Sequence, residues 1–131
     1  REAIAAADRL ERDHGVAANV WSVTSWTELR WDGMTCAGAS GAVREVRPGT
    51  EGGTSWARQR LDATTGPLIA ATDYVSAVPD LIRACVPEGR RYVTLGTDGF
   101  GRSDTRAGLR AFFAVDAAHI VGAALAALRT G

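Results

Sequence analysis

Apolar residues recur at spacings of three and four along the first fourteen residues, which is the pattern of one face of an amphipathic helix. The residues of this face are Ala3, Ala6, Ala7, Leu10 and His14. Gly15 follows the pattern and is a typical helix stop. Because no capping Ser, Thr or Asp precedes Arg1, we expect the helix, and therefore the chain, to be cut from a longer protein.

Beyond Gly15, short apolar runs of strand length alternate with helical patterns of about ten residues. We predict strands over Asn19–Thr24, Pro67–Thr72 and Arg91–Leu95. We predict helices over Trp26–Asp32, Trp56–Asp62, Val75–Val86, Thr105–Phe113 and Ala117–Arg129. This alternation predicts a three-layer α/β/α sandwich with a mostly parallel sheet. If the first helix is a crossover, the strand that precedes it is missing, so we expect the sheet to lack its first strand.

Particular residues refine these predictions. The uninterrupted apolar run at 67–72 is typical of a strand buried on both faces. Pro79 has to lie in the first turn of its helix or to kink it. We expect Ser55 to cap the helix that follows it and Asp116 to cap the last helix. Residues 33–54 are rich in Gly, Ala and Thr, which predicts a flexible surface loop.

Composition excludes several classes of protein. The 131 residues match one domain, and fifteen Arg balance fifteen Asp and Glu, so charge favours neither nucleic-acid binding nor binding to a membrane surface. The absence of Lys excludes Schiff-base and P-loop lysine chemistry. No run reaches the roughly 18–20 apolar residues of a membrane span. The longest, Ala117–Leu128, predicts a buried core helix with His119 as an interior histidine.

Cys36 and Cys85 have neither zinc-ligand nor CxxC spacing. We interpret them as reduced thiols of a cytoplasmic protein. His14 and His119 lack metal-ligand neighbours, and no nucleophile elbow surrounds Ser22. The tryptophans are interpreted as core residues or as residues that a missing domain or second subunit covers; they are Trp21, Trp26, Trp31 and Trp56. We therefore assign no catalytic, cofactor-binding or metal-binding residue.

The segment Gly96–Asp104 is the one candidate site, because it joins a predicted strand to a predicted helix. Its candidate residues for a subunit or anion contact are Thr97, Asp98, Gly99, Phe100, Gly101, Arg102, Ser103, Asp104 and Arg106. One hypothesis is an autonomous α/β module in which the helix start and the arginines bind a phosphate or carboxylate. The other is structural: the glycines allow a tight turn, Ser103 or Asp104 caps the helix, and Arg102 pairs with Asp98. The spacing matches neither the dinucleotide fingerprint nor the P-loop.

Four strings resemble, in the same order, the C-terminal domain of the homodimeric thiamine-diphosphate-dependent pyruvate dehydrogenases. They are SVTSWTEL (Ser22–Leu29), ATDY (Ala71–Tyr74), LGTDGFGRSDTR (Leu95–Arg106) and FAVD (Phe113–Asp116). The third string is the most specific, since transketolases have only a looser version of it. The resemblance covers most of the chain but departs at 33–63 and at Pro79.

The resemblance implies a transketolase-like α/β sandwich whose first strand is followed at once by the helix at which this chain opens. It implies that thiamine diphosphate and Mg²⁺ are bound between the two preceding domains, across a homodimer. The whole enzyme would decarboxylate pyruvate and transfer the acetyl unit to a lipoyl group of the dihydrolipoyl acetyltransferase component. The domain seen here would support the dimer and hold no catalytic centre. The choice of 2-oxo acid stays open, because the residues that set it would lie upstream.

Overall fold

The structure is a computed structural model that describes residues 1–37 and 53–129. Within these residues the strands are β1 (Leu68–Ala71) and β2 (Tyr92–Leu95). The helices are α1 (Glu2–His14), α2 (Trp26–Cys36), α3 (Trp56–Asp62), α4 (Ala77–Asp80), α5 (Arg106–Phe112) and α6 (Ala117–Arg129), with a 3₁₀ turn η1 (Arg83–Cys85) before β2.

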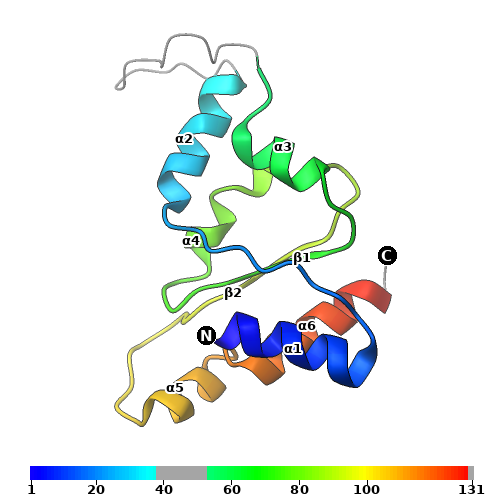
Figure 1. Cartoon of the computed structure of the whole chain (residues 1–131). Helices are drawn as coiled ribbons and strands as arrows, with labels where there is room; N and C mark the ends of the chain where they lie inside the picture. Colours follow the sequence, from blue (N-terminus) through cyan, green and yellow to red (C-terminus); the bar gives the residue numbers. More distant parts are fainter. Residues whose placement is uncertain (38–52, 130–131) are drawn as a thin grey trace.

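The sheet lies between two layers of helices (Figure 1). Its two strands run parallel, with Leu68 opposite Tyr92 and Ala71 opposite Leu95. Helices α1 and α6 lie on one side of the sheet, whereas α2, α3 and α4 lie on the other. The predicted α/β fold with a parallel sheet is therefore confirmed.

The first layer is the pair α1 and α6, which come from the two ends of the chain. Ala6 and Leu10 of α1 are only 1% and 4% exposed. They form one buried cluster with residues of α6, namely Ala117, Ile120, Val121 and Ala124. Ile69 and Leu95 of the strands pack against this cluster, so it is the core between the layer and the sheet. Gly15 ends α1 with a φ of 64°, in the predicted role.

Two carboxylates hold the start of α6. Asp116 caps the helix as predicted, because its Oδ1 accepts a hydrogen bond from the backbone N of His119 at 2.9 Å. Glu2 of α1 adds a second acceptor, with Oε2 3.1 Å from the backbone N of Ala117. The Oε1 of Glu2 also accepts from Nη1 of Arg110 at 2.9 Å. One α1 side chain therefore joins α1, α5 and α6.

Residues 106–129 are long and apolar enough, by length and composition alone, for a helix that crosses a membrane. They form two helices here, because the chain turns at Ala114, whose φ is 57°, and α6 begins afresh after Asp116. The 13 residues of α6 span about 20 Å, short of the roughly 30 Å of a hydrocarbon core. Since α6 packs in the core cluster, the prediction of a buried core helix is confirmed.

His119 corrects the sequence-based prediction of an interior histidine. Its side chain is 48% exposed, and its Nδ1 lies 2.7 Å from Oδ1 of Asp116. The buried stripe of α6 runs through Ile120 and Val121, and residue 119 lies beside it. Because most residues of this helix are apolar, its composition alone does not show which face is buried.

The second layer has a smaller core of Ala57, Ile82 and Cys85, against which Trp26, Leu29 and Tyr92 pack. Ser55 caps α3 as predicted, and its Oγ accepts a hydrogen bond from the backbone N of Arg58 at 3.2 Å. The predicted helix at 75–86 is shorter than expected: it is divided into α4, which contains the buried Pro79, and η1. Pro79 lies in the first turn of α4, which is one of its two predicted placements.

Three other features differ from the predictions: the end of a helix, the absence of a strand and the burial of β1. Helix α2 continues to Cys36, so the predicted loop at 33–54 begins with helical residues; its part at 38–52 lies outside the described residues. Residues 19–24, all of them described, form no strand, and Trp21 is 49% exposed. A strand needs a neighbouring strand to bond to, and in the part of the chain that the structure describes neither β1 nor β2 pairs with these residues. The residues of β1 are half-buried rather than buried on both faces.

Candidate functional site

The loops that follow β1 and β2 meet at the carboxyl edge of the sheet. The backbone N of Thr97 donates to the carbonyl O of Tyr74 at 2.8 Å, and its Oγ1 donates to the carbonyl O of Asp73 at 3.1 Å. Asp98 bonds Ser76 twice: Oδ1 accepts from the backbone N at 2.9 Å and Oδ2 accepts from the hydroxyl at 2.6 Å. The structure thus brings two of the candidate residues, Thr97 and Asp98, onto the neighbouring loop.

Two glycines make this arrangement possible. A Cβ built on Gly96 would lie 2.4 Å from the backbone N of Ser76 and 2.6 Å from the carbonyl O of Tyr74. No side chain fits at that distance, so the two loops approach closely only because residue 96 is glycine. Gly99 has a φ of 97°, a conformation that favours glycine, which agrees with the predicted tight turn.

The predicted pair between Asp98 and Arg102 is wrong. Asp98 takes its two donors from Ser76, whereas the guanidinium of Arg102 lies over the ring of Phe112, 4.1 Å from its centroid. The backbone N–H of Ser76, the N-cap residue of α4, lies on the loop that follows β1 and offers Asp98 a donor there. The parallel pairing of β1 and β2 brings their following loops together, so the partner of Asp98 comes from the neighbouring loop and not from the nearby sequence.

The predicted caps of α5 are also wrong. Thr105 is the N-cap: its Oγ1 accepts from the backbone N of Gly108 at 3.1 Å. Asp104 instead accepts from the backbone N of Thr105 at 2.6 Å, and Ser103 is not the cap. Two backbone donors at the start of this seven-residue helix therefore already have protein acceptors, which weakens the anion-binding hypothesis.

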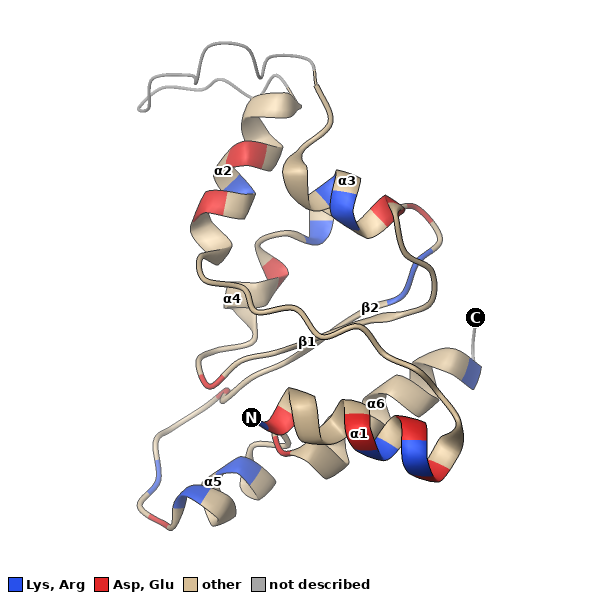
Figure 2. Ribbon diagram, in the orientation of Figure 1, with Lys and Arg blue, Asp and Glu red and all other residues tan. Residues whose placement is uncertain are grey.

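The rest of the candidate segment projects from the molecule. Phe100 is 95% exposed, and every residue from 99 to 106 is exposed. None of the seven residues of α5, all of which the structure describes, is buried, and Phe112 at its end is 57% exposed. Figure 1 shows α5 beside the α1–α6 layer and beyond the end of the sheet, and Figure 2 shows the positive charges that it carries.

Sequence reasoning missed Ser76, Tyr74 and Asp73. The signal that could have found them is their position just after a strand that runs parallel to β2, since the carboxyl ends of neighbouring parallel strands meet at one edge. It also missed Arg90, which has no motif around it.

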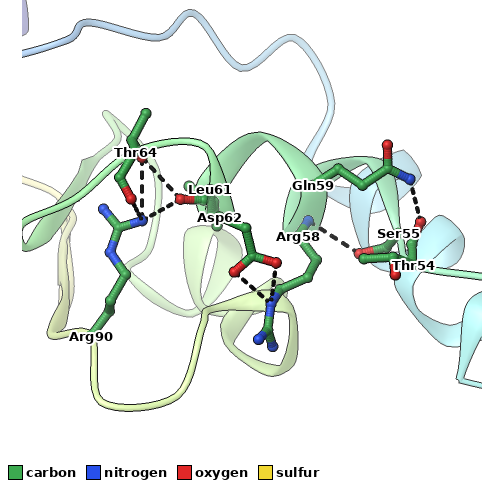
Figure 3. A network of polar contacts seen from close by, with 8 residues as sticks. All are labelled: Thr54, Ser55, Arg58, Gln59, Leu61, Asp62, Thr64 and Arg90. Carbon is green, nitrogen blue, oxygen red and sulfur yellow. Dashed lines mark hydrogen bonds and ion pairs between the residues drawn. The ribbon is translucent and has the colours of Figure 1, made fainter.

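Arg90 joins the turn between α3 and β1 to the approach to β2, at the amino edge of the sheet (Figure 3). Its Nε donates to the carbonyl O of Gly66 at 2.8 Å, and its Nη1 donates to the carbonyl O of Thr64 at 3.0 Å. The same Nη1 also donates to the carbonyl O of Leu61. One guanidinium thus satisfies three backbone carbonyls, a structural role that needs the fork geometry of arginine.

We expect the bond between Asp98 and Ser76 to make stability depend on pH. Hydrogen bonds from the Ser76 hydroxyl and backbone N hold the pKa of Asp98 below its ordinary value. A carboxylate with a lowered folded pKa stabilises the fold above its ordinary pKa, and this stabilisation is lost as pH falls through the folded pKa. The unfolding midpoint in urea should therefore fall between about pH 6 and about pH 3 by less in Asp98→Asn than in the parent chain.

The control for this prediction is Glu11→Gln, which removes an exposed carboxylate of α1. It should keep the pH dependence of the parent chain. If Asp98→Asn and Glu11→Gln behave alike, the loop bond contributes nothing to the acid sensitivity.

No group of three or more His, Cys, Asp or Glu side chains gathers to hold a metal ion in residues 1–37 and 53–129. The carboxylates at the candidate segment, Asp98 and Asp104, each bond a neighbouring protein group. These residues do not form the acidic ligand set that a Mg²⁺-bound diphosphate requires.

Comparison with known proteins places this fold in a family. The model of the transketolase-like TK C-terminal domain family matches residues 1–116. Proteins named pyruvate dehydrogenase E1 component are 47% identical over 128 residues in Cupriavidus necator, 47% over 127 in Mycolicibacterium smegmatis and 41% over 123 in Escherichia coli K12. These alignments cover 98%, 97% and 94% of this chain but only 14%, 13% and 13% of the relatives. The chain therefore belongs to the family of transketolase-like C-terminal domains and spans only 13–14% of the length of the relatives it matches.

Proposed function

We propose that this chain is the C-terminal domain of a pyruvate dehydrogenase that decarboxylates pyruvate and passes the acetyl unit to a lipoyl group of a dihydrolipoyl acetyltransferase. The observation that carries the proposal is the identity of 41–47% along nearly all of the chain to relatives named pyruvate dehydrogenase E1 component. The match of the transketolase-like C-terminal family supports the position within the enzyme.

We propose further that the reactive centre lies in other parts of that enzyme. The cofactor of the whole enzyme would be thiamine diphosphate with Mg²⁺, and the cofactor would supply the carbanion chemistry. The two carboxylates of the candidate segment do not fit that group, because Asp98 and Asp104 each bond a protein donor and no metal-ligand cluster gathers within the described ranges. The chain aligns with only 13–14% of its relatives, which leaves most of their length for the catalytic parts.

The proposed role of this domain is to support the homodimer through the projecting segment 99–112. An exposed phenylalanine at 95% and a second at 57% are unusual on a free surface of a small protein, where large apolar patches mark contact sites. Arg102 lies over the ring of Phe112, so charge and apolar surface are presented together. Aromatic and arginine side chains are the types enriched at subunit interfaces.

Isothermal titration calorimetry tests the placement of the reactive centre. Thiamine diphosphate with Mg²⁺, added to the 131-residue chain, should give no heat of binding, while the complete enzyme binds the cofactor. Tight binding at one cofactor per chain would contradict the proposal.

Inorganic phosphate in the millimolar range should leave the amide NMR shifts of 100–105 unchanged, whereas an anion-binding module would show shifts that Arg102→Ala abolishes.

Phe100→Ser tests the contact role. In the complete enzyme the change should weaken the subunit contact by about 2 kcal/mol, the value of burying one such side chain, and the dimer should dissociate at higher protein concentration in sedimentation velocity. In the 131-residue chain the same change should alter the free energy of unfolding by less than about 0.5 kcal/mol, because the side chain is 95% exposed there. If Phe100→Ser leaves the dimer dissociation of the complete enzyme unchanged, Phe100 has no partner in the assembly.

A further inference from the structure

The two cysteines come together although they are far apart in the sequence. Cys36 is the last residue of α2, and Cys85 is the last residue of η1. A Cβ built on Gly33 would lie only 2.6 Å from the Sγ of Cys85, so this sulfur rests directly on the backbone of α2. Residues 33 and 36 are three apart on one helix, and such residues lie on the same face with their Cβ positions about 5–6 Å apart. The face of α2 that contacts Cys85 is thus the face that carries Cys36.

Both thiols line one open cavity of about 930 Å³ between α2, α3 and η1. Cys85 is 7% exposed and Cys36 is more accessible. Cys36 is therefore the more accessible of the two residues to a reagent that enters the cavity. Burial, with a smaller contribution from Asp32 and Cys85, raises the pKa of the Cys36 thiol.

We propose that Cys36 and Cys85 form a dithiol that closes to an intramolecular disulfide and fixes η1 to the end of α2. The oxidant is a low-molecular-weight disulfide. The Cys36 thiolate attacks one of its sulfurs, and the first small thiolate leaves. The Cys85 thiolate then attacks the Cys36 sulfur and releases the second. Two protein thiols are oxidised, one small disulfide is reduced to two thiols, and the two protons pass to the departing thiolates.

The contact at Gly33 brings the Cys85 sulfur to the helix that carries Cys36. Because residue 33 has no side chain, the Cys85 sulfur lies against the backbone of α2 at this position. A disulfide needs Cα atoms about 4.4–6.8 Å apart, so closure requires the last residue of α2 and the last residue of η1 to reach that separation. The bond would close a loop of about fifty residues and restrict the unfolded chain.

The test uses the complete protein that contains this chain, treated with excess oxidised glutathione at about pH 8.5, because mildly alkaline solution increases the thiolate fraction over that at neutral pH. The sample is quenched by alkylation, cleaved with trypsin and analysed by mass spectrometry. Trypsin releases Cys36 within residues 31–44 and Cys85 within residues 84–90, because it cleaves after Arg. We expect the two peptides to be joined, with a mass about 2 Da below their sum, and the link to be lost in Cys36→Ser and in Cys85→Ala.

A second measurement distinguishes a disulfide that forms in the folded protein from one that forms only after the protein has unfolded. The melting temperature should rise on oxidation in the parent protein and stay unchanged in both single variants, since only the parent can close the loop. A glutathione adduct that persists on Cys36 while Cys85 stays reduced would overturn the proposal. So would a link between two copies of the Cys36 peptide, or a linked peptide whose formation lowers the melting temperature.

Discussion

Gly96→Ala should destabilise the 131-residue chain by about 2–4 kcal/mol, lowering its melting temperature by roughly 10 °C. The new methyl group would lie 2.4 Å from the backbone N of Ser76 and 2.7 Å from its Cα. These are backbone atoms of a loop that four hydrogen bonds hold to residues 97 and 98, so they cannot move aside as a flexible side chain does. Relief of the clash would separate the two loops and break those bonds.

The matched control is Gly122→Ala. Gly122 is in α6, is exposed, and has no atom within 4 Å of a built Cβ. Alanine is the better helix former by about 0.5–1 kcal/mol, so this variant should be slightly more stable than the parent chain. Thermal unfolding followed by circular dichroism measures both. If Gly96→Ala is as stable as the parent, the loops do not approach as the structure has them.

The sequence predicted the features that depend on neighbouring residues. Ser55 and Asp116 cap their helices, and Gly15 ends α1, because each acts on a backbone only a few residues away. The alternation of strands and helices likewise predicted the parallel sheet. The cap of α5 was predicted to within one residue. Thr105 caps the helix rather than Asp104, and polar composition alone does not distinguish these two neighbours.

The features that depend on distant partners could not be predicted in the same way. The strand expected at 19–24 needed a neighbouring strand, and its β-rich composition alone supplies none. Asp98 lies four residues from Arg102 but bonds Ser76, twenty-two residues away, because β1 and β2 are parallel neighbours. At the candidate site, the sequence therefore identified the right loop after β2 but not the loop after β1 that completes it.

Leu10→Ala should cost about 2–5 kcal/mol of stability, because it removes the large side chain by which α1 enters the core. Leu10 is 4% exposed and lies in one cluster with α6, and its α1 neighbour in that cluster is the small Ala6. Ile4→Ala is the control on the same helix: Ile4 is 58% exposed, so its loss should change the free energy of unfolding by less than about 0.5 kcal/mol.

Hydrogen exchange shows which amides of Leu10→Ala lose protection, and this distinguishes loss of the α1–α6 contact from destabilisation of the whole chain. Hydrogen exchange in Leu10→Ala should quicken first at the amides of α1 and α6, since these helices share the cluster and the Glu2 bridge to Ala117. The amides of α3, whose core is the separate cluster around Ala57 and Ile82, should change later. Equal loss of stability in both alanine variants would mean that α1 does not pack on α6, and the first layer of the fold would then have to be assigned differently.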